Sequence, residues 1–325
     1  MSEVSSYGEG MDVGTDDVSD GVQDTGNVTS EVTTSAIDVA EDNYGKGVET
    51  FSFAENVSHG TEISAGSHNF DVSHSMEDAQ KSVESFHIQS IEQILSSNGK
   101  YMTEANRERV GKGADSVTAV EHSETRGHTG AYMFSHGKSN IEVSAQNTAQ
   151  MERSTKHETN HFASNNREII VPDPENKGYT VYKTVGTRQT SWFHSNETGK
   201  DSDFKSKGQG LNEGLTTMYT NQQLSELSPE KGTEAQRQGI YPYSTEVCQQ
   251  LEEILGKDTL KEAYYGGNIN GLSEKVDSLA GEKGYESLCE CLDRTLSKDP
   301  GERVQAMKDA QAILERMYEK EGGEQ

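Results

Sequence analysis

Residues 157–161 read His-Glu-Thr-Asn-His and lie within a stretch, 146–164, that the sequence predicts to be a helix. Positions four apart on a helix share one face, so the imidazoles of His157 and His161 can bind one metal ion. Glu158, one step round the helix, can reach a water on that ion. Zinc lowers the pKa of such a water, and a neighbouring carboxylate can accept its proton. The pattern therefore predicts a hydrolytic zinc site with Glu158 as general base.

A site of this kind needs a third protein ligand and keeps one position for water. The metzincin continuation of the motif is absent, because Ser164 and Arg167 stand where it has glycine and a third histidine. The best remaining candidate is Glu213, in a predicted helix over 211–226. The alternative for Glu213 is a carboxylate that only stabilises the start of this helix. Three nearer carboxylates rank lower because they lie at a strand or a proline-rich turn: Glu168, Asp173 and Glu175.

Together these segments resemble the gluzincins, the HExxH zinc peptidases whose third ligand is a glutamate on a later helix. Residues 157–164 are similar to their active-site helix, and Asn212-Glu213 is similar to their downstream Asn-Glu. The resemblance implies an α+β, zincin-like fold for residues 81–325, with a small sheet packed on the HExxH helix and a helical C-terminal half. It also implies one Zn²⁺ per chain, held by the two histidines and this glutamate, and a peptide or protein substrate.

Two features depart from the gluzincin pattern. Fifty-one residues separate His161 from Glu213, more than in the thermolysin-like members. Thr217 stands where these enzymes often have an aspartate that orients the first histidine. Its hydroxyl can accept a hydrogen bond but brings no negative charge, so we expect it to support His157 without a charge.

A group that stabilises a developing oxyanion is also needed. His194 and Tyr243 are the first candidates, and further ones are Tyr179, Tyr182, Tyr219 and Tyr241. Arg188 is a candidate for binding a substrate carboxylate. The sequence does not choose among these residues. The seven other histidines, from His59 to His136, have no partner at ligand spacing, and we expect solvated or turn positions for them.

The acidic residues are concentrated at the start of the chain. Residues 1–80 hold 17 Asp or Glu and one basic residue, Lys46, so they carry −16 of the formal charge of −26. Few of them are large and apolar, which predicts disorder, because little surface could be buried to offset chain entropy. One small apolar island consists of Val48, Phe51 and Phe53. Order is predicted to begin near Lys81, where the metallohydrolase domain, 81–325, starts.

Periodic patterns predict the other elements. Helices are expected from Lys81 to Asn98 and throughout the region after Tyr243. Strands are expected as a pair around a turn within 130–144, and at 167–171 and 179–185, with a loop around Gly199–Gly210. The last helix has Asp299 as N-cap, Pro300 at its first position and Glu302 completing a capping box.

The negative charge argues against nucleic acid and anionic membrane surfaces as partners. The N-terminus has no basic region followed by an apolar run, and no stretch approaches the roughly 20 apolar residues of a membrane span. We therefore expect a cytoplasmic protein, while export without such a signal stays open. Three cysteines lack the CxxC spacing of a thiolate zinc site, and we expect buried thiols at Cys248, Cys289 and Cys291.

Two alternatives to a zinc peptidase stay open. In the first, the same zinc site hydrolyses a non-peptide amide or ester. In the second, the chain is a non-catalytic interaction protein with a degenerate site. Peptide is preferred as the substrate by analogy with the resembled family, and the sequence does not determine the oligomeric state.

Overall fold

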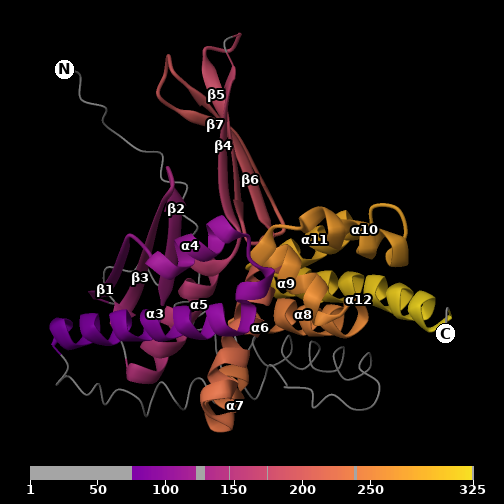
Figure 1. Ribbon diagram of the computed structural model, residues 1–325. Coiled ribbons are helices and arrows are strands. Elements are labelled where there is room, and N and C mark those ends of the chain that lie inside the picture. The colour runs from indigo at the N-terminus through magenta and orange to yellow at the C-terminus, as the bar shows by residue number, and fades with distance from the viewer. Residues whose placement is uncertain (1–74, 122–128, 146, 174, 238–239, 324–325) are drawn as a thin grey trace, which may run out of the picture.

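The structure is a computed structural model (Figure 1). It describes residues 75–121, 129–145, 147–173, 175–237 and 240–323. Most of the region predicted to be disordered, with its apolar island, lies outside these residues. The predicted boundary near Lys81 falls inside a helix, α3 (Met76–Asn98). This helix begins earlier than predicted because the side chain of Ser75 accepts a hydrogen bond from Asp78 N–H, which satisfies a donor of the first turn.

The described residues form ten α-helices and two small sheets, which confirms the predicted α+β class. The elements that follow α3 are, in order, the 3₁₀ turn Gly99–Tyr101, α4 (Glu104–Lys112), β1 (Ser116–Glu121), β2 (Gly130–Ser135), β3 (Lys138–Ala145), α5 (Thr148–Ala163), β4 (Asn166–Asp173), β5 (Gly178–Val185), β6 (Arg188–Ser195) and β7 (Asp201–Lys207). The helices that follow are α6 (Gln209–Leu227), α7 (Pro229–Arg237), α8 (Pro242–Leu255), α9 (Lys257–Gly266), α10 (Ile269–Ala280), α11 (Gly284–Arg294) and α12 (Pro300–Gly323). None of the described helices has the length and apolar character needed to cross a membrane.

The first sheet has the strand order β1–β3–β2, with β3 parallel to β1 and antiparallel to β2. Helices α3 and α5 pack against it. Ile141 and Val143 of β3 and Phe162 of α5 are fully buried in this core. The predicted pair of strands and the predicted helix over 146–164 are confirmed in β2, β3 and α5. Strand β2 is an edge of this sheet and lies beside α5.

Strands β4 to β7 form an antiparallel meander that projects from the body as an arm (Figure 1). The predicted strands at 167–171 and 179–185 are confirmed in β4 and β5. The predicted loop around Gly199–Gly210 is wrong, because β7 and the start of α6 occupy it. Most of the arm meets water on both faces, so β7 needs no alternation of apolar side chains and has a single large one, Phe204. A strand of this composition gives no periodic signal.

Helix α6 is central to the C-terminal half, where it contacts α5, α8 and α11. The predicted helix over 211–226 is confirmed in α6, and the predicted helical region in α8 to α12. Asp299 caps α12 by accepting a hydrogen bond from Gly301 N–H at 2.8 Å. The predicted capping box is not formed, because Glu302 accepts a hydrogen bond from the hydroxyl of Ser297 instead.

His87 of α3 is buried, contrary to the expectation of a solvated position. Its Nε2 accepts a hydrogen bond from Ala114 N–H at 3.3 Å, so its Nδ1 carries the proton and donates to Thr159 Oγ1 at 2.9 Å. Thr159 lies on α5, so this neutral imidazole ties α3 to the side of α5 that faces away from His157 and His161. Burial lowers the pKa of His87 to about 4.

This pKa predicts a pH-dependent stability. The ordinary histidine pKa is 6.5, so between pH 6.5 and 4 the unfolded chain binds the proton that the folded chain excludes. Stability should be fully present above pH 6.5 and fall as the pH drops to 4, by up to about 3 kcal/mol. Urea unfolding of metal-free protein at pH 7 and pH 4.5 measures the loss. A His87→Gln variant should be less stable at pH 7 but lose less on acidification; equal losses would contradict the prediction.

Candidate metal centre

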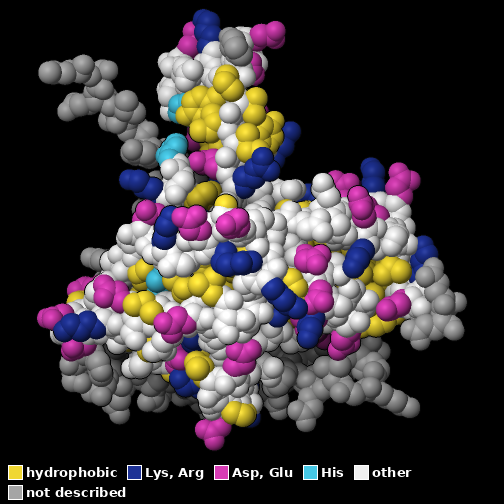
Figure 2. All heavy atoms as spheres, viewed as in Figure 1, with side chains coloured by type: hydrophobic (Ala, Val, Ile, Leu, Met, Phe, Trp, Pro, Cys, Tyr) yellow, Lys and Arg dark blue, Asp and Glu magenta, His cyan; other side chains and the backbone are white. Residues whose placement is uncertain are grey.

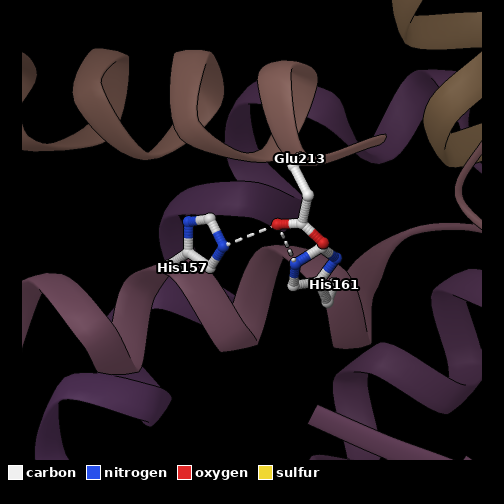
Figure 3. A group of neighbouring side chains, drawn as sticks. All are labelled: His157, His161 and Glu213. Atoms are coloured by element: carbon white, nitrogen blue, oxygen red, sulfur yellow. Dashed lines mark hydrogen bonds and ion pairs between the residues drawn. The ribbon is translucent and has the colours of Figure 1, made fainter. Parts of the chain in front are cut away.

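Two helices bring three potential ligands together. His157 and His161 lie one turn apart on α5, and Glu213 points towards them from the first turns of α6 (Figure 3). All three side chains are buried. The structure therefore brings together the three residues that the sequence predicted as metal ligands, although 51 residues of chain lie between His161 and Glu213.

Two of the three distances between donor atoms match the edge of a tetrahedral zinc site. Nε2 of His157 and Nε2 of His161 each lie 3.3 Å from Glu213 Oε2. All three donors lie within 4.8 Å of one another. A tetrahedron with donor–zinc distances of about 2.0–2.1 Å has donor–donor edges of about 3.3 Å, and two imidazoles with one carboxylate is a donor set of catalytic zinc sites. The three residues could hold a metal ion, and zinc matches the donors.

The charges within the group are strongly coupled. Burial opposes ionisation of Glu213, but the charge and hydrogen bonds of the two histidines outweigh it and hold the pKa of Glu213 well below its usual range. Burial disfavours the protonated form of His161, while the carboxylates of Glu213 and Glu158 favour it by more, so the pKa of His161 is raised. Glu213 is thus a carboxylate ready to act as ligand, and a bound metal ion would displace the proton from His161.

The Nδ1 atom of His161 faces two side chains of α6. Thr216 Oγ1 is 3.3 Å away and Asn212 Nδ2 is 3.2 Å away. The Thr216 hydroxyl donates to the main-chain oxygen of Asn212 at 2.7 Å, so its oxygen can accept from His161 Nδ1–H and from Tyr264 OH, which is also 2.7 Å away. A histidine that binds metal through Nε2 carries its proton on Nδ1. Thr216 is the acceptor that this tautomer needs.

Thr217 does not play the predicted part. Its hydroxyl is buried and has no hydrogen-bond partner among the described residues. The hydroxyl of its neighbour Thr216 instead lies 3.3 Å from His161 Nδ1. The prediction was therefore wrong by one position, and the hydrogen bond is made to His161 instead of His157.

A buried polar seam holds α5 and α6 in register behind the site. Asn160, the residue before the second histidine, donates through Nδ2 to Thr220 Oγ1 at 3.1 Å. Its Oδ1 accepts from Tyr265 OH at 3.0 Å and from Gln223 Nε2 at 3.3 Å. Gln223 also accepts from the hydroxyl of Ser90 on α3 at 3.1 Å. Since a slip of either helix would break several of these buried bonds, the seam keeps Glu213 opposite the histidines.

The start of α6 is capped by a residue from far along the chain. Gly208 precedes the helix with φ of 77° and has no side chain to cap it. Asp293 of α11 supplies the carboxylate instead, accepting hydrogen bonds from Gly208 N–H at 2.9 Å and Gly210 N–H at 2.7 Å. Burial raises the pKa of Asp293, although these N–H donors favour its charge. The cap fixes the helix turn that carries Glu213.

The proposed base, Glu158, lies against the edge strand β2. A methyl group added at Gly130 would come within 2.9 Å of Cγ and Oε1 of Glu158. The absence of a side chain at Gly130 therefore makes room for the carboxylate. The backbone of β2 passes directly beside Glu158 as a result.

Of the residues proposed to stabilise an oxyanion, Tyr241 lies at the site. Its ring centroid is 6.2 Å from that of His157. Arg188, at the start of β6, is close enough for Glu213 and Asp293 to favour its charge, although burial lowers the pKa of Arg188. A phenol and a guanidinium thus accompany the three metal-binding residues.

The two first candidates for that role are His194, on the arm, and Tyr243, on α8. Thr187, beside the start of β6, donates its N–H to Asn212 Oδ1 at 3.0 Å and so marks the base of the arm. His194 is seven residues farther out, about 20 Å at the rise of a strand, and its Nδ1 is 2.7 Å from Asp201 Oδ1. Tyr243 packs against the hydrophobic core, where burial raises its pKa. The position of His194 therefore disagrees with the prediction, whereas the role of Tyr243 stays a prediction.

The remaining candidates lie on the arm or in the core. Tyr179 stacks on His194 near the outer end of the arm, and Tyr182 is exposed on its surface. Tyr219 is buried against the rings of Tyr264 and Tyr265.

Sequence reasoning missed four residues that shape the site: Gly130, Thr216, Tyr264 and Asp293. Thr216 carried a weak signal, because it lies four positions after Asn212 and three after Glu213, on the same helix face. The other three contact the site from distant parts of the chain and carried none.

Comparisons with known protein families, with curated proteins and with solved structures find no match for this chain. The functional argument therefore depends on the geometry of the centre and on its own residues.

The geometry predicts one zinc per chain, lost when a ligand is removed. His157→Ala, His161→Ala or Glu213→Ala should weaken zinc binding by more than about 100-fold, since even residues that only support ligands contribute 10–100-fold. Zinc content by elemental analysis and competition with a chromophoric chelator measure this. Glu175→Ala, an exposed carboxylate of the arm, is the matched control and should keep its zinc. Full zinc retention in the three ligand variants would remove the assignment.

Proposed function

We propose that the protein is a zinc-dependent hydrolase of the gluzincin type, with a zincin-like catalytic domain, and that its substrate is a peptide. One observation carries the proposal. The Nε2 atoms of His157 and His161, on α5, each lie 3.3 Å from Oε2 of Glu213, on α6, and all three side chains are buried. Glu158 directly follows His157 in the sequence. Zinc held there would polarise a carbonyl group and lower the pKa of a water.

Three residues of the chain would supply the other catalytic groups. Glu158 accepts the proton of the attacking water and passes it to the leaving amine, as a general base and then a general acid. Tyr241, whose ring centroid is 6.2 Å from that of His157, would donate a hydrogen bond to the developing oxyanion. Arg188 supplies a positive charge beside them, which suits a substrate carbonyl or carboxylate.

A peptide fits the strand that borders the base. Strand β2 is the edge of its sheet among the described residues, and its Gly130 lies against Glu158. An extended peptide can add to such an edge through main-chain hydrogen bonds, which brings its carbonyl groups past the catalytic carboxylate. A small amide or ester would gain nothing from this strand, so the edge favours peptide over the non-peptide alternative.

Replacement of the base separates binding from chemistry. Glu158→Gln should keep one zinc per chain, because Glu158 is not a ligand, while the rate of peptide hydrolysis falls by about 10²–10⁴-fold. Zinc analysis and cleavage of a mixed peptide library, read by mass spectrometry, give the two results. A Glu158→Gln variant as active as the parent would contradict the assigned role. Inactive parent protein with bound zinc would favour a degenerate site.

Gly130 provides a second test of the base and of the strand beside it. In Gly130→Ala the new methyl group should displace the flexible carboxylate of Glu158 and reduce hydrolysis by about 10–100-fold, because small misplacements of a catalytic group are costly. Zinc content and melting temperature should stay near those of the parent. Gly111→Ala is the control, since a methyl group there meets nothing within 4 Å. Equal activity of the two variants would show that Gly130 does not position Glu158.

A further inference from the structure

Strand β4 is one edge of the arm, and its outer side pairs with no strand in the described part of the chain. Three consecutive aliphatic side chains on it are between 39 and 48% exposed: Ile169, Ile170 and Val171. Figure 2 shows the hydrophobic side chains gathered on the arm. The opposite edge, β7, carries two aspartates and two lysines, which discourage pairing. An apolar edge such as β4 is instead a template for another strand.

One hydrogen bond shows which backbone groups of β4 point outwards. Gly186 N–H donates to Asn165 O at 3.0 Å, in the same register as the β4–β5 ladder. Hydrogen-bonded pairs alternate along antiparallel strands, so the odd-numbered residues of β4 bond to β5. The N–H and C=O groups of Glu168 and Ile170 therefore face away from the sheet. Pro172 agrees with this, because its missing N–H falls on the outer side.

We propose that β4 pairs with β4 of a second copy of the chain, antiparallel and about a two-fold axis at Ile170, so that two arms form one eight-stranded sheet. This register places the outward groups of Ile170 opposite those of the second copy and exchanges two hydrogen bonds. It also places Arg167 opposite Asp173 of the second copy, and by the two-fold symmetry Asp173 lies opposite Arg167 of the second copy. The edge is therefore complementary to itself in backbone and in charge.

The neighbouring two-fold register fits less well. An axis at Ile169 would place Arg167 opposite Val171 and leave the charge without a carboxylate. The axis at Ile170 instead places Ile169 opposite Val171, on the sheet face that also carries Tyr182. Asp173 already accepts hydrogen bonds from Asn176 at 3.1 and 2.8 Å, which hold its carboxylate at the end of β4 and leave lone pairs for an arginine.

The pairing has one cost and one geometric condition. Pro172 cannot donate to Glu168 of the second copy, so one hydrogen bond is missing at each end of the paired segment. At the base of the arm, Glu168 Oε2 accepts a hydrogen bond from His136 N–H of the β2–β3 turn. Because the paired segment runs from Arg167 to Asp173, the strand of the second copy must pass beside this turn without breaking that hydrogen bond. The proposed dimer does not depend on the proposed function, since it uses none of the metal-binding residues.

A cysteine at the axis tests the register directly. In the proposed dimer the two Cα atoms of residue 170 are about 5.5 Å apart, within the range of a disulfide. Full-length Ile170→Cys should therefore form a disulfide-linked dimer on oxidation with oxidised glutathione, while the native cysteines are buried. Phe204→Cys, an exposed position on β7, is the matched control and should cross-link at least about ten-fold more slowly. Equal rates for the two variants would overturn the register.

Sedimentation of the full chain tests the dimer without cross-links. The parent should shift from a 35.6 kDa monomer to a species of twice that mass as concentration rises. Ile170→Lys places two like charges at the axis, and Arg167→Glu places a carboxylate opposite Asp173; each should weaken association by at least about ten-fold. Lys205→Glu, the same charge change on β7, should associate like the parent.

The other outcomes contradict the proposal. A parent that stays monomeric at several hundred micromolar excludes the dimer. A parent dimer that persists unchanged in Ile170→Lys uses another surface. Unchanged melting temperatures for the exposed positions Arg167 and Ile170 show that the variants fold, so loss of association then reports the interface alone.

Discussion

The burial of Glu213 between two imidazoles is the constraint on which the rest of this structure depends. A carboxylate that is only 3% exposed loses most of its hydration, and the loss is tolerated only where positive charge and hydrogen bonds replace the water. His157 and His161 provide both, and a zinc ion would provide more. Because the carboxylate of Glu213 must stay within hydrogen-bonding distance of both imidazoles, helix α6 can shift very little relative to α5 at this point.

Two polar devices enforce that packing. The seam around Asn160 sets how far α6 slides along α5, and the Asp293 carboxylate sets where α6 begins. Apolar packing alone would tolerate small shifts between the helices, whereas buried hydrogen bonds do not, since each broken bond leaves an unsatisfied group. Polar residues within the core thus serve the geometry of the site more than the free energy of folding.

The arm explains the unusual spacing of the ligands. Strands β4 to β7 occupy most of the chain between α5 and α6, and the strands leave and return to the body at adjacent points. Asn165 accepts a hydrogen bond from Gly186, and Thr187 donates to Asn212, so the base of the arm is bonded to the residues that flank the ligands. The length of the arm therefore does not change the geometry of the site. The arm does expose the apolar edge strand β4, which a second copy of the chain could cover.

The sequence by itself determined the elements with a strong period and the residues whose spacing is local. Two histidines four apart on α5 share a face whatever the rest of the chain does, and Glu158 follows from the same helix geometry. The α+β class and most helices and strands were readable, because an apolar stripe on a helix or strand is a local property. The elements that the sequence did not predict are α4, β1, β6, β7 and α7. Strand β7 shows one reason, because it is exposed along nearly all of its length and so has no apolar stripe.

Only the tertiary structure decided which distant residues complete the site. The meeting of Glu213 with the histidines was inferred from resemblance, and its register became visible only when α6 packed on α5. The sequence pointed to Thr217 and His194, whereas packing placed Thr216 and Tyr241 beside the ligands. The physical reason is that a side chain one position along a helix turns by about 100°, and that contacts across 50 to 130 residues depend on the paths of the helices and strands between them.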